Sequence, residues 1–237
     1  FNNNTGGVIN IDQSTNTGLY NNGPLTNSAT ITIGAVKTVG YSGIDNRANL
    51  NNNTGGIINI DRSTNTGLYN SGTINNKATI IIGAIASIGQ SGFINQTNLN
   101  NNTGGIINID RSTFIGLYNN TLGTLNNGAN INIGATVAVG LYGIYNEGAF
   151  NNNVGGIIKS DRSSSFGIYN LLGTFNNGAI INVGGIANVG NYAIQNNALF
   201  NNNAGGDIKM DRVSTSGISL ESSTFTNLGK VTIGEML

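Results

Sequence analysis

The sequence repeats the motif Phe/Leu-Asn-Asn-Asn-x-Gly-Gly at a nearly constant spacing. Its copies begin at Phe1, Leu50, Leu99, Phe150 and Phe200, and they divide the chain into units of about fifty residues. A looser motif, of the form Leu-x-Asn-x-Ala-x-Ile-x-Ile-Gly, begins within each unit at Leu25, Ile74, Leu125, Phe175 and Phe225. The working period is therefore about 24 to 26 residues, and such a period is typical of repeat proteins, whose units bury their apolar faces by stacking.

The repeat continues without a change of composition from residue 1 to residue 237. This predicts a single elongated domain of five tandem repeats, with the boundaries 1–49, 50–98, 99–149, 150–199 and 200–237. Charged residues make up 8% of the chain and balance to zero, so we expect no nucleic-acid partner. The most apolar stretch, residues 80–88, is far shorter than the roughly 20 residues of a membrane span. We therefore expect no membrane span.

Each period contains three short runs in which apolar and polar residues alternate, as at Gly18-Leu-Tyr-Asn, Leu25-Thr-Asn and Ile31-Thr-Ile. Alternation with a period of two indicates strands with one buried face, and abundant glycine and asparagine disfavour helices. The sequence thus predicts an all-β right-handed parallel β-helix, or β-solenoid, of about ten coils with three strands each. The handedness follows from the general preference of parallel crossovers. A β-propeller and a β-sandwich remain as alternatives.

Asparagine, with 46 of 237 residues, recurs in fixed columns. Stacked asparagines in a parallel solenoid can bond amide to amide along the axis, so we expect the first column to form a buried structural ladder. Its members are Asn3, Asn27, Asn52, Asn76, Asn101, Asn127, Asn152, Asn177, Asn202 and Asn227. A second column contains Asn21, Asn46, Asn70, Asn95, Asn119, Asn146, Asn170 and Asn196, and it ends where Leu220 replaces asparagine. Because the first column points inward, glycan attachment at its Asn-x-Thr sites is not expected.

Two stretches carry a resemblance to a known class of proteins. They are Gly143-Ile-Tyr-Asn-Glu-Gly-Ala-Phe-Asn-Asn and Gly167-Ile-Tyr-Asn-Leu-Leu-Gly-Thr-Phe-Asn-Asn-Gly-Ala-Ile. Both are similar to the I-x-N-x-G-x-x-x-N-x-G-x-I pattern of bacterial surface β-helix repeats, found in filamentous haemagglutinins, autotransporter passengers and related adhesins. The resemblance covers essentially the whole chain. It implies an exported surface or fibre protein, extracellular or at the cell surface, and carries over no binding residues.

The acidic and basic residues that could serve catalysis occur as Asp-Arg pairs on every second coil. The pairs begin at Asp61, Asp110, Asp161 and Asp211, and Asp12-Gln13 is a partial fifth copy. Equivalent carboxylates would lie about 9.6 Å apart, which suits no retaining glycosidase and lies at the outer limit for an inverting one. A calcium site would need several carboxylates converging in one coil. We therefore interpret the pairs as a charge-paired ladder that closes a turn, and expect no catalytic, cofactor-binding or metal-binding residues.

The residue between the inward aliphatic and the inward asparagine of one run must point outward, and tyrosine is frequent there. This column offers a candidate contact face for a sugar or a partner, or simple cross-coil stacking. The tyrosines of this face are Tyr20, Tyr69, Tyr118, Tyr145 and Tyr169. An outward column on another face holds threonine only at Thr32 and Thr232, so ice binding is a minor alternative.

The sequence as a whole predicts a non-enzymatic structural or adhesive solenoid, such as a segment of a fibre, sheath or adhesin. Its expected contacts are end-to-end self-association or flanking repeats of a longer chain, and carbohydrate or a host or cell surface. The alternative function is a carbohydrate-active β-helix enzyme, a polysaccharide lyase or hydrolase.

Overall fold

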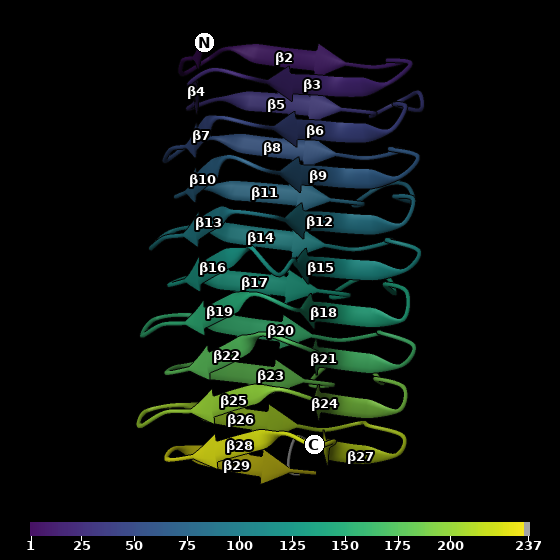
Figure 1. The fold of residues 1–237 in the computed structure, drawn as a ribbon. Coiled ribbons are helices and arrows are strands. Elements are labelled where there is room, and N and C mark those ends of the chain that lie inside the picture. Colours follow the sequence, from purple (N-terminus) through teal and green to yellow (C-terminus); the bar gives the residue numbers. More distant parts are fainter. Residues whose placement is uncertain (235–237) are drawn as a thin grey trace.

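The computed structural model describes residues 1–234, so the last expected repeat, 200–237, extends beyond the described part. Within residues 1–234 the regular structure consists of strands, and no helix is present. The strands form three sheets of 10, 10 and 9 strands, here called sheets A, B and C. The chain visits the sheets in turn, and every strand pairs in parallel with the next strand of its own sheet (Figure 1). The molecule is therefore a parallel β-solenoid with three strands per coil, as the sequence predicts.

The strands of each sheet stack from the N-terminal to the C-terminal end. Sheet A contains β1 (Asn2–Asn3), β4 (Leu25–Asn27), β7 (Asn49–Asn52), β10 (Thr73–Asn76), β13 (Asn98–Asn101), β16 (Thr124–Asn127), β19 (Ala149–Asn152), β22 (Thr174–Asn177), β25 (Leu199–Asn202) and β28 (Thr224–Asn227). Sheet B contains β2 (Val8–Ile11), β5 (Thr30–Ile33), β8 (Ile57–Ile60), β11 (Thr79–Ile82), β14 (Ile106–Ile109), β17 (Asn130–Ile133), β20 (Ile157–Ser160), β23 (Ile180–Val183), β26 (Asp207–Met210) and β29 (Lys230–Ile233). Sheet C contains β3 (Thr17–Asn21), β6 (Ser42–Asn46), β9 (Thr66–Asn70), β12 (Ser91–Asn95), β15 (Ile115–Asn119), β18 (Tyr142–Asn146), β21 (Phe166–Asn170), β24 (Tyr192–Asn196) and β27 (Ser216–Leu220).

A continuous apolar core runs along the axis between the three sheets. Sheet B supplies two inward aliphatic columns, as at Ile58 and Ile60, and both side chains are fully buried. Sheet A supplies one apolar column, in which Leu50 occupies the same place as the stacked rings of the C-terminal coils. The ring centroids of Phe150 and Phe175 lie 4.4 Å apart with planes 10° from parallel. In-register stacking thus places like side chains in contact along the axis and closes the core.

The inward asparagines of sheet A form the expected ladder. Asn101 donates from Nδ2 to Oδ1 of Asn127 at 2.8 Å, and every bond of the column runs in the same direction, from Asn3 toward Asn227. Asn127 is fully buried, whereas Asn227 in the last coil is exposed. The ladder therefore satisfies buried amides without charge, as buried polar groups require.

Two further asparagine ladders accompany the first. The inward column of sheet C runs from Asn21 to Asn196 in the same direction, with amide bonds of 2.6 to 2.8 Å. An outward column on sheet A, from Asn51 to Asn201, runs in the opposite direction, as when Asn75 Nδ2 donates to Asn51 Oδ1 at 2.9 Å. This third ladder was not predicted from the sequence.

Two kinds of coil alternate along the axis. Coils that start with β1, β7, β13, β19 or β25 have a glycine pair after their sheet A strand, and we call them glycine-pair coils. The first glycine of such a pair, Gly55, has a φ of 86°, and a Cβ on the second, Gly56, would lie 2.3 Å from Asn52 Oδ1. The other coils, called long-corner coils, connect sheets B and C by eight-residue corners, such as 34–41 and 83–90. Glycine is thus required for conformation at one position and for space at the next.

Candidate functional site

The five tyrosines of the expected contact face all lie on the outer side of sheet C, but they do not form one continuous row. Tyr118 pairs in register with Tyr145, and Tyr145 pairs with Tyr169, so these three are consecutive. Asp45 separates Tyr20 from Tyr69, and Ile94 separates Tyr69 from Tyr118. The face therefore consists of two single tyrosines in the N-terminal half and a row of three that extends from the middle of the solenoid toward its C-terminal end.

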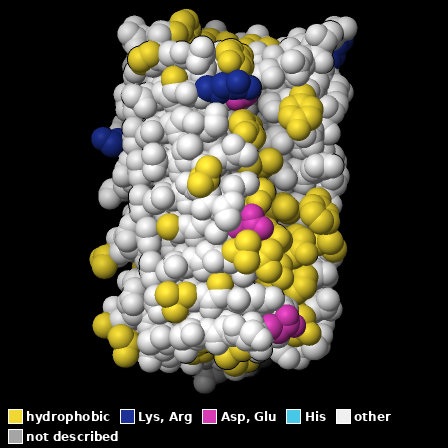
Figure 2. All heavy atoms as spheres, in the orientation of Figure 1, with side chains coloured by type: hydrophobic (Ala, Val, Ile, Leu, Met, Phe, Trp, Pro, Cys, Tyr) yellow, Lys and Arg dark blue, Asp and Glu magenta, His cyan; other side chains and the backbone are white. Residues whose placement is uncertain are grey.

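The C-terminal part is a larger aromatic cluster than the sequence indicated. Figure 2 shows hydrophobic side chains gathered on this side of the lower half of the molecule, next to acidic side chains. Tyr145 contacts Tyr118 and Tyr169 edge to face, with ring centroids 5.2 Å and 5.3 Å away. A second row of rings joins them, and the Tyr142 and Phe166 rings of this row are stacked at 5.1 Å. The whole aromatic cluster consists of Phe114, Tyr118, Tyr142, Tyr145, Phe166, Tyr169 and Tyr192.

The second row was missed because the sheet C strands interrupt strict alternation. In β18, Tyr142 and Tyr145 are half-buried on the outer side, while Gly143 and Ile144 between them are both buried. A Cβ on Gly143 would lie 2.5 Å from the carbonyl oxygen of Gly167 in the next coil, so this position accepts only glycine or a local shift. Two residues three apart therefore share the outer face. The recurrence of an aromatic residue directly before the glycine, at Tyr142 and Phe166, was the available signal.

The neutral form of the phenol is favoured at Tyr118 and Tyr145, whose pKa values are raised. Tyr118 donates its hydroxyl to Glu147 Oε2 and accepts from Asn120 Nδ2 at 3.2 Å. Burial raises the pKa of Tyr118, and the hydrogen bond and charge of Glu147 raise it further. Burial, followed by the charge of Glu147, raises the pKa of Tyr145 to about 12. A catalytic acid or base needs a pKa near the working pH, so these phenols are suited to packing and hydrogen bonding.

The carboxylates of the Asp-Arg pairs hold backbone in the following coil. Asp61 Oδ1 accepts the backbone N–H groups of Ile85 at 2.9 Å and of Ala86 at 3.0 Å, at the start of a long corner. The Asp61 side chain is buried, so these bonds satisfy a charge that water does not reach freely. The same arrangement recurs at Asp12, Asp110 and Asp161.

The arginines of the pairs reach in the opposite direction. Arg62 Nη1 donates to the carbonyl oxygen of Gly34 at 2.9 Å and to that of Ala35, both in the preceding long corner. Equivalent bonds are made by Arg111, Arg162 and Arg212. The expected charge pairing within the motif is therefore wrong in most copies. Among residues 1–234 a salt bridge of this kind joins Arg212 to Asp211, at 3.2 Å, and none joins the earlier pairs.

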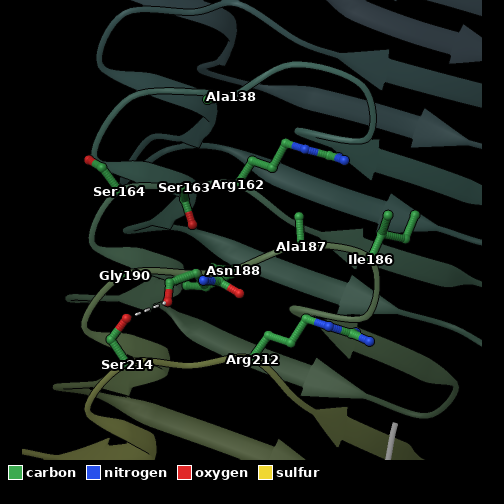
Figure 3. A pocket seen from close by; sticks show the side chains of 11 residues that line it. Ala138, Arg162, Ser163, Ser164, Ile186, Ala187, Asn188, Gly190, Arg212 and Ser214 are labelled. Atoms are coloured by element: carbon green, nitrogen blue, oxygen red, sulfur yellow. Dashed lines mark hydrogen bonds between the residues drawn. The ribbon is translucent and has the colours of Figure 1, made fainter. Parts of the chain in front are cut away.

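These corners enclose a groove of about 670 Å³ on the outside of the solenoid. Figure 3 shows Arg162 and Arg212 extended one below the other, with Ser163 next to Arg162 and Asn188 on the coil between the two arginines. No carboxylate lines the groove, and both guanidinium groups are bound to carbonyl oxygens. The chain has no histidine or cysteine, so Ser163 has no imidazole base to activate it. The groove thus lacks the paired acids of a glycosidase and the histidine base that activates the serine of a hydrolytic triad.

Within 1–234, no cluster of three or more histidine, cysteine, aspartate or glutamate residues could hold a metal ion. The same residues include no helix of the length and hydropathy that crossing a membrane requires.

No protein-family model matches the sequence, and no curated protein is similar enough to count as a relative. A crystal structure of a TibC-catalyzed, hyper-glycosylated TibA fragment aligns with 97% of this chain and 95% of its own, at 12% identity and a TM-score of 0.22. Because that TM-score is low, no property of the TibA fragment is transferred to this chain. The residues themselves carry the functional argument, and what they show is a parallel β-solenoid consistent with the surface β-helix proteins that its repeats resemble.

Proposed function

We propose that the chain is a non-enzymatic structural or adhesive solenoid, a segment of a fibre, sheath or adhesin at a cell surface or outside the cell. The observation that carries this proposal is the use of the repeated charged residues. Asp61 binds backbone N–H groups of the next coil, and Arg62 binds carbonyl groups of the preceding coil. The groups that a polysaccharide lyase or hydrolase would need for proton transfer therefore serve to hold coils together.

The two ends of the solenoid are also suited to stacking on further coils of the same kind. Each sheet ends in a strand that is paired on one side, such as β2 with β5 and β29 with β26. Since every bond of the inward sheet A ladder runs from Nδ2 to Oδ1, the N-terminal coil presents the Asn3 acceptor and the C-terminal coil presents the Asn227 donor. Head-to-tail stacking opposes a donor to an acceptor, whereas head-to-head stacking opposes two acceptors. The occupant of the ends is a second copy or further coils of a longer chain.

Light scattering and electron microscopy of the isolated 237-residue chain test the association. We expect particles that lengthen with concentration at the width of one solenoid. Ile233, which is 61% exposed at the open end of sheet B, provides a sharp variant, because Ile233→Lys places a charge in the contact. Thr232→Lys is the matched control, since lysine already occupies its outward column at Lys209. A strictly monomeric wild type at high concentration would remove self-association and leave flanking coils as the occupant.

Catalysis is tested separately by incubating the protein with neutral and acidic polysaccharides and measuring new reducing ends and unsaturated products. We expect no turnover. Turnover that Asp110→Ala or Asp161→Ala abolishes, while the protein stays folded by circular dichroism, would overturn the structural proposal in favour of the enzyme.

A further inference from the structure

One coil departs from the repeat at three positions that lie together on the outer side of sheet C. In the long-corner coil that contains β6, these positions hold Tyr41, Asp45 and Arg47. The equivalent residues in the three later long-corner coils are Gln90, Ile94 and Gln96, then Leu141, Tyr145 and Glu147, then Asn191, Gln195 and Asn197. The fold therefore accepts uncharged side chains at all three positions, and the local stability of the coil does not require an ion pair.

The three residues form part of a pocket of about 300 Å³, which is at the lower end of the range for small-molecule sites. Asp45 lies at its base with 9% of its surface exposed. Arg47 binds the Asp45 carboxylate at 3.2 Å from Nε and at 2.9 Å from Nη2. The remaining lining residues are Asn16, Thr17, Ser42 and Tyr69.

Aromatic rings fix the shape of this pocket on both sides. The Arg47 guanidinium lies over the Tyr20 ring, with Cζ 5.0 Å from the ring centroid, which holds the arginine in place. Tyr69 donates its hydroxyl to Gln96 Oε1 at 2.6 Å, so its ring orientation is set from the neighbouring coil. Tyr41 is 60% exposed and presents apolar ring surface at the rim. The pocket thus combines oriented aromatic surface with one polar pair.

The polar pair has hydrogen-bonding capacity left over. The carboxylate of Asp45 has more acceptor sites than Arg47 occupies, and Nη1 of Arg47 remains available to donate. The two charges cancel, so the pocket offers no net charge for an anion or a cation. The Arg47 side chain is 52% exposed, so this ion pair is a weak source of stability. In β12, Ile94 occupies the position of Asp45 without such a pair.

We propose that this pocket binds one pyranose ring of a neutral glycan. Adjacent hydroxyl groups of the sugar donate to Asp45 and accept from Arg47, while the C–H face of the ring packs on Tyr41 or Tyr69. A purely apolar ligand would take water away from the remaining acceptor sites of Asp45 and from Arg47 Nη1 without replacing its hydrogen bonds. The proposal gives the adhesive role a ligand class and rests on that role only for its biological setting.

The test is isothermal titration calorimetry, with saturation-transfer NMR for weak binders, on a panel of methyl pyranosides. The neutral probes are the methyl glycosides of glucose, galactose, mannose and N-acetylglucosamine, and the anionic probe is the methyl glycoside of sialic acid. We expect saturable binding of at least one neutral probe at one site per chain. Binding by the sialic acid probe alone, or by no probe on the panel, would overturn the proposal.

The repeat supplies the matched variants. Asp45→Ile with Arg47→Gln installs the residues of the next long-corner coil, so the protein should fold and melt as the wild type does. This double variant should weaken binding at least about tenfold. Gln195→Ile with Asn197→Gln installs the same two residues at the equivalent positions of the last long-corner coil and should leave binding unchanged. Equal binding by wild type and the first double variant would place the sugar elsewhere. Measuring all proteins in the Ile233→Lys background separates this result from failure of the end-to-end proposal.

Discussion

Asn101 donates its side-chain amide to Asn127 across a boundary between coils at 2.8 Å, and both side chains are buried. Asn127 in turn donates to Asn152 at 2.8 Å and to its own corner at Ala129 at 3.0 Å. One asparagine therefore satisfies the coil before it, the coil after it and a turn of its own coil. These three sets of hydrogen bonds explain why every described coil has asparagine at this position of sheet A.

Replacing Asn127 with leucine should lower the free energy of unfolding by about 1 to 3 kcal/mol, because it leaves buried amide groups without partners. Chemical denaturation followed by circular dichroism measures the change. Asn108→Leu is the control, since Asn108 lies half-buried on the outer side of β14 and should tolerate the change. If Asn108→Leu is as damaging as Asn127→Leu, the inward ladder does not contribute in this way.

Replacing Gly143 with alanine should cost about 1 to 3 kcal/mol, because its Cβ would lie 2.5 Å from the Gly167 carbonyl oxygen. Gly128→Ala is the matched substitution, since the nearest atom to its Cβ is 3.7 Å away, at Asn101 O. Removing glycine there should be neutral or stabilise by about 0.4 to 1 kcal/mol. Thermal melts of both variants decide the point, and a similar loss in both would argue against close packing in sheet C.

Replacing Asp110 with alanine should cost about 1 to 3 kcal/mol and loosen the next long corner. The variant leaves unpaired the N–H groups of Thr136 and Val137, which Asp110 Oδ1 accepts at 3.1 Å each. Hydrogen exchange measured by mass spectrometry should rise in the segment 134–141. Asp207→Ala, which removes a salt bridge of 3.3 Å to half-exposed Lys209, should change stability by less than about 1 kcal/mol. Unchanged hydrogen exchange in the segment 134–141 of Asp110→Ala would contradict the role of Asp110 in holding this corner.

Tyr145 should ionise at a higher pH than an ordinary tyrosine. The pKa of Tyr145 is raised from 10.0 to about 12, by burial first and by the charge of Glu147 second. Because the fold favours the neutral phenol, its contribution to stability is complete below pH 10 and is lost as the pH rises toward about 12. Absorbance at alkaline pH should show a late fraction of tyrosine ionisation, and Glu147→Gln should move that fraction to lower pH without abolishing the effect of burial. A titration that Glu147→Gln leaves unchanged would contradict the assigned contribution of Glu147.

The repeated parts of the structure could be predicted from the sequence, because period and alternation determine them. A 24- to 26-residue period with three alternating runs leads to the three sheets, and the inward Asn127 column follows from the same alternation. The destination of Asp61 and Arg62 could not be read in this way. Their partners are backbone groups of neighbouring coils, between 24 and 28 residues away. Because nearly every residue has the same backbone groups, the residue types do not indicate which groups are bound.

The candidate sites were predicted only in part. The column of Tyr118, Tyr145 and Tyr169 follows from alternation, but the Tyr142 row does not, because Gly143 interrupts the alternation. The pocket at Asp45 depends on residues from a strand, a corner and a neighbouring coil. In the sequence, Asp45 interrupts a column of tyrosines. In the structure, Asp45 lines a pocket together with residues of neighbouring coils.

The bonds that Asp61 and Arg62 make to neighbouring coils limit how a gene encoding such a rod can change in length. Asp61 grips the long corner that follows it and Arg62 grips the long corner that precedes it, so each glycine-pair coil fits between two long-corner coils. Recombination that deletes one coil would bring two coils of the same kind together. A buried carboxylate would then lose its hydrogen-bond partners. Recombination that adds or removes a whole unit of about fifty residues restores every junction. The length of such a rod is therefore expected to change in steps of one coil pair.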